Sequence, residues 1–370
     1  MKKNYTFIVL LFIIFGYAQP PTNYYNNATG LGYTLKTQLK TIITNGHSDQ
    51  GYGSLWSAYA TTDRDFGIGY ENDNSIVDMY SENPSGTDPY IFIYDTNQCG
   101  SYASEGDCYN REHLVPQAYW ENVNVNPMKN DPHHVIPTDG KVNGVRDNFP
   151  FGKVNIASFT SQNGSKKGSN LNSGYSAGYT GIVFEPIDEF KGDIARCLFY
   201  FATRYENQMA QFYSSASVQS KDMFDGSINQ VFSATFLNIL LQWNNDDPVS
   251  IKEVKRNNAI YAYQGNRNPY IDDNTYVTKI WGSPLATTTF DILANVTIYP
   301  NPANDHKISI ESELPLDEIQ LININGQILQ EIKKPIAQYH TYTLENLQKG
   351  FYFVKLSADN QNTFRKVIVN

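Results

Sequence analysis

The sequence is poor in histidine and cysteine and carries no excess of positive charge. Its 370 residues include six histidines and three cysteines, and 28 Lys and Arg stand against 37 Asp and Glu, a formal net charge of −9. An acidic chain repels polyanions at long range, so any binding of nucleic acid needs a local basic patch or bound cations. Because the cysteines form no close CxxC pair, a metal site built on cysteine is disfavoured.

Long apolar runs are also scarce. One short run, Phe7–Phe15, follows the basic pair Lys2 and Lys3 and precedes the small residues of "GYA", which end at Ala18. This order is typical of a secretory signal peptide, predicted at residues 1–18, and the run is short for the alternative, a membrane anchor. Since no later run is long enough to cross a bilayer, we expect a mature protein that is soluble, outside the cytoplasm and not inserted in a membrane.

The three cysteines fall into two environments. Cys99 and Cys108 bracket a short Gly- and Ser-rich loop, where a disulfide is expected in an oxidising compartment, although two unrelated thiols are the alternative. Cys197 lies on the apolar side of a predicted helix, so we expect a buried free thiol.

Periodicity divides the remaining chain into an α+β domain and a small all-β domain. Apolar residues at helical spacing predict helices over 31–44, 192–206, 228–243 and 247–263, the last with Asp247 as N-cap. Alternating apolar runs in 52–95 suggest strands.

After "IWGSP" a Thr-rich link leads into short alternating runs, with a hairpin expected at "NING". The predicted domains are therefore a catalytic domain, 19–283, a linker, 284–294, and a β-sandwich, 295–370. The sandwich contains no cluster of His, Asp and Glu, so we place catalysis in the first domain.

The groups that can carry chemistry gather in residues 108–152. They are an imidazole, a carboxylate, carboxamides and guanidinium groups, from His113, Glu112, Asn143, Asn148, Arg111 and Arg146. Phosphodiester hydrolysis needs such a set: a base for water, a cation at the leaving oxygen and positive charge on the phosphate. Oxygen ligands favour Mg²⁺ or Ca²⁺ over zinc, and the zinc-protease pattern HExxH is absent because Glu precedes His here.

Several motifs in order resemble the endonuclease I family of secreted and periplasmic bacterial nucleases, over roughly residues 30–283. They are "GDCYNREHLVP", "PTDGKVNGVRDNFPFG", "VFEPIDEFKGDIAR" and "DPVS…RNNAIYAYQGNRNPYID". The resemblance implies a ββα-metal (His-Me finger) element inserted among helices. It implies that His113 is the general base and that Glu112 and Asn143 hold Mg²⁺, with Ca²⁺ or Mn²⁺ as alternatives. It further implies hydrolysis of DNA, and often RNA, with little sequence preference and 5′-phosphate ends.

One branch of that family carries an arginine about twenty residues after the catalytic histidine, and this sequence has none there. The resemblance therefore leaves phosphate stabilisation to Arg146 or Arg111. Nearby polar residues have structural interpretations that we favour or keep open: His134 as a hydrogen-bonded structural residue, Arg196 in an ion pair with Glu185 or Asp193, Asp147 as a supporting group or a helix cap, and His133 with no assigned role.

The C-terminus resembles a second family. "YPNP", "ININGQIL", "LQKGFYFVKL" and "FRKVIVN" are similar to the C-terminal sorting domain of the type IX secretion system. The resemblance implies the type IX machinery as a partner and a secreted, extracellular or cell-surface protein.

Three functions are therefore compared. The leading hypothesis is a secreted, monomeric, Mg²⁺-dependent endonuclease that hydrolyses DNA and RNA. The alternatives are a secreted ribonuclease and a catalytically inactive surface protein that binds nucleic acid or serves in adhesion. Metal-dependent cleavage separates the first two from the third.

Overall fold

The computed structural model describes residues 20–66, 70–282, 296–358 and 361–370. The chain divides into two compact units, Met1–Gly282 and Ser283–Asn370. The predicted signal peptide, residues 1–18, and the predicted linker, residues 284–294, lie outside the described residues. In the part of the chain that is described, no helix is both long and apolar enough to cross a bilayer.

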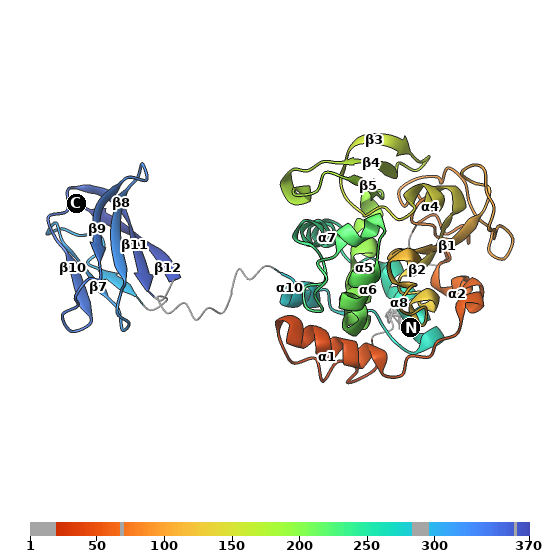
Figure 1. The fold of residues 1–370 in the computed structure, drawn as a ribbon, viewed down its shortest axis with the longest axis horizontal. Helices are drawn as coiled ribbons and strands as arrows, with labels where there is room; N and C mark the ends of the chain where they lie inside the picture. Colours follow the sequence, from red (N-terminus) through yellow and green to blue (C-terminus); the bar gives the residue numbers. More distant parts are fainter. Residues whose placement is uncertain (1–19, 67–69, 283–295, 359–360) are drawn as a thin grey trace, which may run out of the picture. The chain divides into compact units, whose positions relative to one another are not determined.

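The first unit is mainly helical (Figure 1). Its α-helices are α1 (Gly32–Thr44), α2 (Leu55–Thr62), α3 (Gln117–Trp120), α4 (Gly140–Arg146), α5 (Lys191–Arg204), α6 (Met209–Ser215), α7 (Ala234–Asp246), α8 (Ile251–Gln264), α9 (Pro269–Asp272) and α10 (Thr275–Ile280). Short 3₁₀ helices cover Tyr52–Ser54, Met128–Asn130, Gly174–Ser176, Asp188–Phe190, Glu206–Gln208 and Gln219–Met223. Its strands are β1 (Tyr109–His113), β2 (Val135–Asp139), β3 (Val154–Thr160), β4 (Lys166–Asn170) and β5 (Ile182–Glu185).

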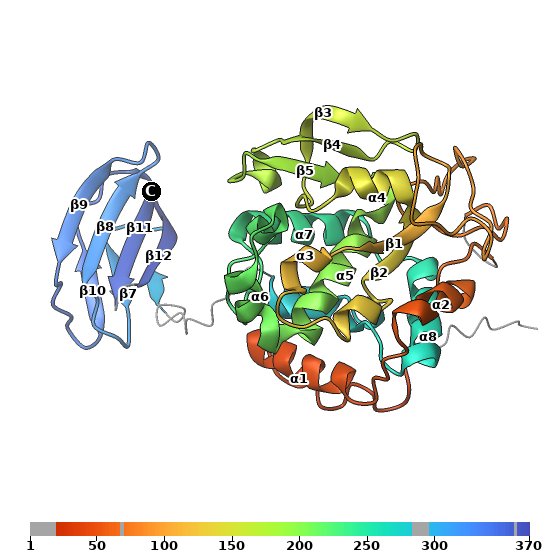
Figure 2. The same ribbon diagram turned by 45° about the vertical axis from the view of Figure 1, so that its right-hand side comes forward.

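Helix α5 forms the centre of this unit. All its residues before Arg204 are buried, as expected for a helix that is packed on every side. It packs against α1 and α7, and Figure 2 shows it enclosed by neighbouring elements. The helices predicted at 31–44 and 192–206 are confirmed as α1 and α5. Cys197 on α5 is a buried free thiol, as predicted, and burial raises its pKa to about 12.

Two predicted helix starts were wrong. Helix α7 begins at Ala234, so residues 228–233 are not helical. Helix α8 is capped by Ser250, whose side chain accepts from the Glu253 amide while the Glu253 side chain accepts from the Ser250 amide. Asp247 instead ends α7, and its side chain accepts from the backbone N–H of Gly192 at 2.8 Å.

The strands predicted in 52–95 are also absent: the described residues from Arg64 to Gln98 form turns and coil with isolated bridges. Side-chain carboxylates here accept the backbone N–H groups that a strand would use for its ladder. Asp78, for example, accepts from the N–H group of Tyr80 at 2.8 Å, and Asp73 accepts from that of Ser75 at 2.8 Å. The disulfide expected between Cys99 and Cys108 at the end of this segment is present, with Cα atoms 5.7 Å apart.

The second unit is all-β, as predicted. Its strands are β6 (Thr297–Tyr299), β7 (Ile308–Glu311), β8 (Glu318–Asn323), β9 (Ile328–Lys333), β10 (Thr341–Leu344), β11 (Gly350–Ala358) and β12 (Gln361–Val369). One sheet has the order β10-β7-β6 and the other the order β12-β11-β8-β9, and an apolar cluster that includes Ile310, Leu321 and Val354 forms the core. The hairpin expected at "NING" joins β8 to β9. The α+β class of the first domain and the β class of the second are therefore confirmed.

Candidate active site

A short antiparallel pair followed by a helix positions the candidate site. β1 pairs with β2, with Glu112 opposite Ile136, and α4 begins directly after β2. Asp139 starts this helix, because its side chain accepts the backbone N–H of Val142 at 2.8 Å. The end of β1 and the inner face of α4 line an open pocket of about 530 Å³.

His113 is held in one tautomer. Its Nε2 lies 3.2 Å from the backbone carbonyl oxygen of Lys129, which can only accept a hydrogen bond. Nε2 therefore carries the proton, and Nδ1, 3.4 Å from the side-chain amide of Gln117, presents its lone pair. Burial and then the neighbouring His134 hold the pKa of His113 well below its usual value, so the imidazole stays neutral near pH 7. A neutral, oriented imidazole at a pocket wall has the form of a general base.

Glu112 is a buried carboxylate with two side-chain partners. Its Oε1 accepts from the Tyr80 hydroxyl at 3.0 Å and pairs with Nη1 of Arg146 at 3.0 Å. Burial raises the pKa of Glu112 to about 7, against the opposing influence of Arg146 and of the Tyr80 hydrogen bond. A carboxylate that is costly to ionise in the free protein gains from a bound cation.

Asn143 faces the same pocket from α4. Its Nδ2 donates to Oδ1 of Asn110 at 2.6 Å, which fixes the carboxamide and leaves its oxygen for another ligand. Asn110 and Glu112 lie two residues apart on β1, so their side chains share one face of the strand. Their partners Asn143 and Arg146 lie three residues apart on α4, so they share one face of the helix. This matched spacing places Glu112 and Asn143 on the lining of one pocket.

The donors fit a hard cation. Mg²⁺ is bound in proteins by one or two carboxylate or amide oxygens and keeps several waters for substrate to displace. Glu112 and Asn143 supply such oxygens at a pocket that is open to solvent. Among the described residues, this pocket offers no trio of His, Cys or carboxylate ligands of the kind that zinc prefers.

Arg146 is buried, and its Nη1 and Nη2 atoms donate to acceptors within the protein. Besides Glu112, its Nη1 donates to the carbonyl oxygen of His113 at 3.0 Å and its Nη2 to that of Leu114 at 2.6 Å. The guanidinium thus ties the end of β1 to α4 and fixes the backbone that carries both Glu112 and His113. These contacts favour a positioning role over the predicted contact with phosphate, which stays a prediction.

Arg111 is the more accessible of the two arginines. Its guanidinium stacks on Tyr52, 3.4 Å from the ring centroid, and on Trp56 at 4.4 Å, while Nη1 donates to the Tyr52 carbonyl at 2.8 Å. The Lys129 ammonium lies over the same Tyr52 ring at 4.6 Å. Two cations therefore surround one aromatic ring beside His113, an arrangement suited to a phosphate.

Other polar residues singled out in the sequence have structural roles. His134 Nε2 bonds the Met128 carbonyl at 2.7 Å, and His133 Nε2 bonds the Asn266 carbonyl at 3.2 Å. Arg196 is fully buried and pairs with Glu253 and with Asp193, which confirms the ion-pair interpretation; Glu185 pairs with lysines instead. Asp147 occupies the C-cap position of α4.

Four contributors were not predicted: Tyr52, Tyr80, Asn110 and Gln117. Asn110 had a detectable signal, because it lies two residues before Glu112 on a strand. Tyr80 lies in coil 32 residues before Glu112, and no sequence periodicity connects the two.

Comparison with known proteins gives two family matches. Residues 31–275 match the family described as Endonuclease I, and residues 297–370 match the secretion system C-terminal sorting domain.

Individual relatives agree with the first match. The chain is 33% identical over 260 residues to an extracellular ribonuclease of Bacillus amyloliquefaciens, covering 70% of this chain and 78% of that protein. An extracellular ribonuclease of Bacillus subtilis is 33% identical over 267 residues, with 72% and 80% covered. Endonuclease-1 of Buchnera aphidicola subsp. Baizongia pistaciae is 24% identical over 199 residues, with 48% and 69% covered.

Proposed function

The chain belongs to the endonuclease I family of nucleases, and on this basis we propose that it is a secreted, Mg²⁺-dependent endonuclease that hydrolyses phosphodiester bonds of RNA and DNA. One observation carries the proposal. The unprotonated Nδ1 of His113, the carboxylate of Glu112 and the carboxamide of Asn143 belong to one open pocket on the β1–β2–α4 element. This element has the strand–strand–helix order of a His-Me finger.

His113 acts as general base in this proposal. Nδ1 takes a proton from a water molecule, whose oxygen then attacks phosphorus in line with the leaving 3′ oxygen. The P–O3′ bond breaks, the phosphate stays on the 5′ oxygen of the downstream nucleotide, and the 3′ oxygen of the upstream nucleotide takes a proton from solvent. The Lys129 carbonyl holds the imidazolium that forms, because Nε2–H continues to donate to it.

Glu112 and Asn143 are the residues that would hold Mg²⁺, which when bound stabilises negative charge on the phosphate and on the leaving oxygen. Arg146 keeps the Glu112 carboxylate in place, and Tyr80 fixes its rotation. Arg111, stacked on Tyr52 and Trp56, is placed to contact a phosphate oxygen with the N–H groups that it does not use internally.

A ribonuclease is the second candidate function. The observation in its favour is that the two Bacillus relatives, matched over 78% and 80% of their length, are both named extracellular ribonucleases. The catalytic groups are the same for either substrate, so rates on RNA and on duplex DNA of equal phosphate concentration decide between them.

The C-terminal sorting domain supports export through secretion machinery to the cell surface or beyond. The partner in that step is the type IX machinery, and the N-terminal signal peptide remains a prediction from residues 1–18.

Removal of the divalent cation should abolish cleavage of both substrates. We expect no activity in EDTA, recovery with excess MgCl₂, and an apparent Mg²⁺ affinity that falls as the pH drops. The pKa of Glu112 is raised to about 7 in the free protein, so below pH 7 a proton must leave before the cation binds. The affinity should therefore fall by roughly tenfold per pH unit below 7 and level off above it.

The measurement is the Mg²⁺ concentration that gives half-maximal cleavage of RNA, between pH 5.5 and 8.5. A Glu112→Gln variant serves as the control, because without this carboxylate neither Mg²⁺ binding at this site nor cleavage should be detected at any pH in this range. Cleavage in EDTA equal to that in MgCl₂ would contradict metal dependence, and no cleavage under any condition would favour the inactive surface protein.

Replacing Arg111 with Gln should lower the catalytic efficiency on nucleic acid without much loss of folding stability. We expect kcat/KM to fall by roughly 10- to 100-fold, since a charge-assisted contact to phosphate is worth about 1.5–3 kcal/mol. The slope of log(kcat/KM) against log[salt] should also become shallower. Lys141→Gln on α4 is the matched control. Equal kcat/KM values for the two variants would show that Arg111 does not contact the substrate.

A further inference from the structure

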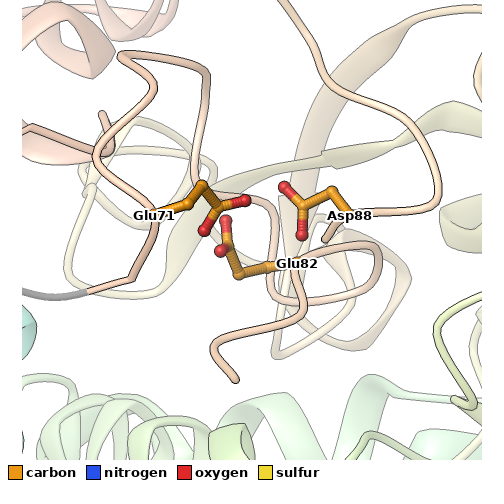
Figure 3. Close-up of side chains that lie close together, drawn as sticks. All are labelled: Glu71, Glu82 and Asp88. Carbon is orange, nitrogen blue, oxygen red and sulfur yellow. The ribbon is translucent and has the colours of Figure 1, made fainter. Parts of the chain in front are cut away.

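Outside the active-site pocket, three carboxylates converge in the coil that connects α2 to β1. Figure 3 shows the side chains of Glu71, Glu82 and Asp88 pointing toward one another. One oxygen from each lies within 4.8 Å of the others. We propose that these three residues form a Ca²⁺ site, separate from the catalytic cation, that stabilises this coil.

The burial of Glu82 is the observation that points to a ligand. Its side chain is 1% exposed, and both of its carboxylate oxygens are buried without a hydrogen-bond partner. A buried carboxylate without partners is strongly unfavourable unless a proton or a cation compensates its charge. Burial, and then Asp88 and Glu71, raise the pKa of Glu82 to about 10, and burial raises that of Asp88 to about 7. A divalent cation would supply the missing partner of Glu82 and offset the negative charge of all three carboxylates.

The chemistry of the donors favours Ca²⁺ among biological cations. Ca²⁺ binds oxygen at 2.3–2.6 Å, so two of its ligands lie up to about 5 Å apart, and the observed spacing meets this limit. It also tolerates irregular geometry, which suits ligands from coil, and takes carboxylates together with carbonyls and waters. Glu71 is exposed and Asp88 half-buried, so the site opens to solvent on one side while Glu82 forms its floor.

The position of the site gives it a consequence for the molecule. Glu71 and Asp88 flank the segment that carries Asp78 and Tyr80, so one ion on these carboxylates would bridge both ends of it. Within that segment, Asp78 accepts from the Asp139 amide at 2.7 Å, and Tyr80 donates to Glu112 at 3.0 Å. Ca²⁺ would therefore stabilise the coil that supports β2 and the catalytic carboxylate. The described residues of this coil have no regular ladder of backbone hydrogen bonds to stabilise them.

The test is thermal unfolding of the full chain followed by tryptophan fluorescence. All four tryptophans, at positions 56, 120, 243 and 281, belong to the first unit, so the signal reports on that unit alone. The protein is stripped with EGTA and measured in EGTA, in 10 mM CaCl₂ and in 10 mM MgCl₂. With a dissociation constant of about 0.1 mM, Ca²⁺ should raise Tm by roughly 5–10 °C, and Mg²⁺ by less than half as much.

Variants separate this site from the catalytic one. Glu82→Gln should remove the Ca²⁺-specific rise in Tm, whereas Glu112→Gln should keep it. Isothermal titration of CaCl₂ should give one bound ion per chain in Glu112→Gln and none in the double variant Glu82→Gln/Glu112→Gln. If Glu82→Gln does not fold, Glu71→Gln takes its place, because Glu71 is exposed and its replacement should not disturb folding. Glu71→Gln should weaken Ca²⁺ binding. A wild-type protein without a Ca²⁺-specific rise, or an undiminished rise in both Glu71→Gln and Glu82→Gln, would overturn the proposal. Neither readout depends on nuclease activity.

Discussion

Replacing His113 with alanine should lower the rate of RNA and DNA cleavage at saturating Mg²⁺ by roughly 10²- to 10⁴-fold, the usual contribution of a positioned general base. The variant lacks the Nδ1 lone pair, and no other described histidine replaces it. His134 is the nearest, with its ring centroid 6.1 Å from that of His113, but its Nε2 is bound to the Met128 carbonyl and burial lowers its pKa to about 4.

The loss should fall on kcat rather than on folding or substrate binding. The measurement is kcat and KM on a defined RNA, with circular dichroism and Tm recorded for the same preparation. His340→Ala, an exposed histidine of the second unit, is the matched control and should retain wild-type rates. A His113→Ala variant that is folded and cleaves within threefold of the wild type would contradict the assignment of the base.

Replacing Arg146 with methionine should destabilise the first unit by about 3–5 kcal/mol, the typical cost of removing one partner from a buried ion pair. Methionine is of similar length, so little volume is lost, but Glu112 and the carbonyls of His113 and Leu114 lose their donor. Activity should fall as well, because the backbone that carries the base and the metal carboxylate is no longer fixed. Chemical denaturation followed by tryptophan fluorescence measures the free energy of unfolding.

Two further variants make this prediction specific. Lys279→Met breaks a half-exposed pair with Asp273 at 3.7 Å and should cost at most about 1 kcal/mol. The double variant Glu112→Gln/Arg146→Met should recover part of the loss, because it no longer buries an unpaired carboxylate. A loss for Arg146→Met as small as that for Lys279→Met would show that the buried pair does not hold the site together.

The candidate catalytic residues were easier to predict from the sequence than the residues that hold them in place. Glu112, His113 and Asn143 lie in short motifs of distinctive composition, and the structure places all three at one pocket. Tyr80 and Tyr52 act through tertiary contacts that leave no local pattern, so they could not be predicted from the sequence. The role of Arg146 was equally hidden, because a buried arginine that bonds two carbonyls and an exposed one that binds phosphate look alike in a sequence.

The fold followed the sequence where apolar periodicity is strong. Helix α1 buries one face and α5 is buried on every side, and both were predicted nearly to their ends. The coil between α2 and β1 was mistaken for strands, because Asp side chains within it accept nearby backbone N–H groups that a strand would use for its ladder. At α8, a capping box at Ser250 prevailed over the Asp-Pro signal three residues earlier.

The most direct measurement is Mg²⁺ binding by isothermal titration, paired with the cleavage rate, in wild type, His113→Ala and Glu112→Gln. If Glu112 holds the cation and His113 only moves a proton, His113→Ala should bind Mg²⁺ with wild-type affinity but cleave roughly 10²- to 10⁴-fold more slowly. Glu112→Gln should lose both binding at this site and cleavage. A His113→Ala variant that binds Mg²⁺ as weakly as Glu112→Gln, or a Glu112→Gln variant that cleaves at the wild-type rate, would contradict the division of roles between these two adjacent residues.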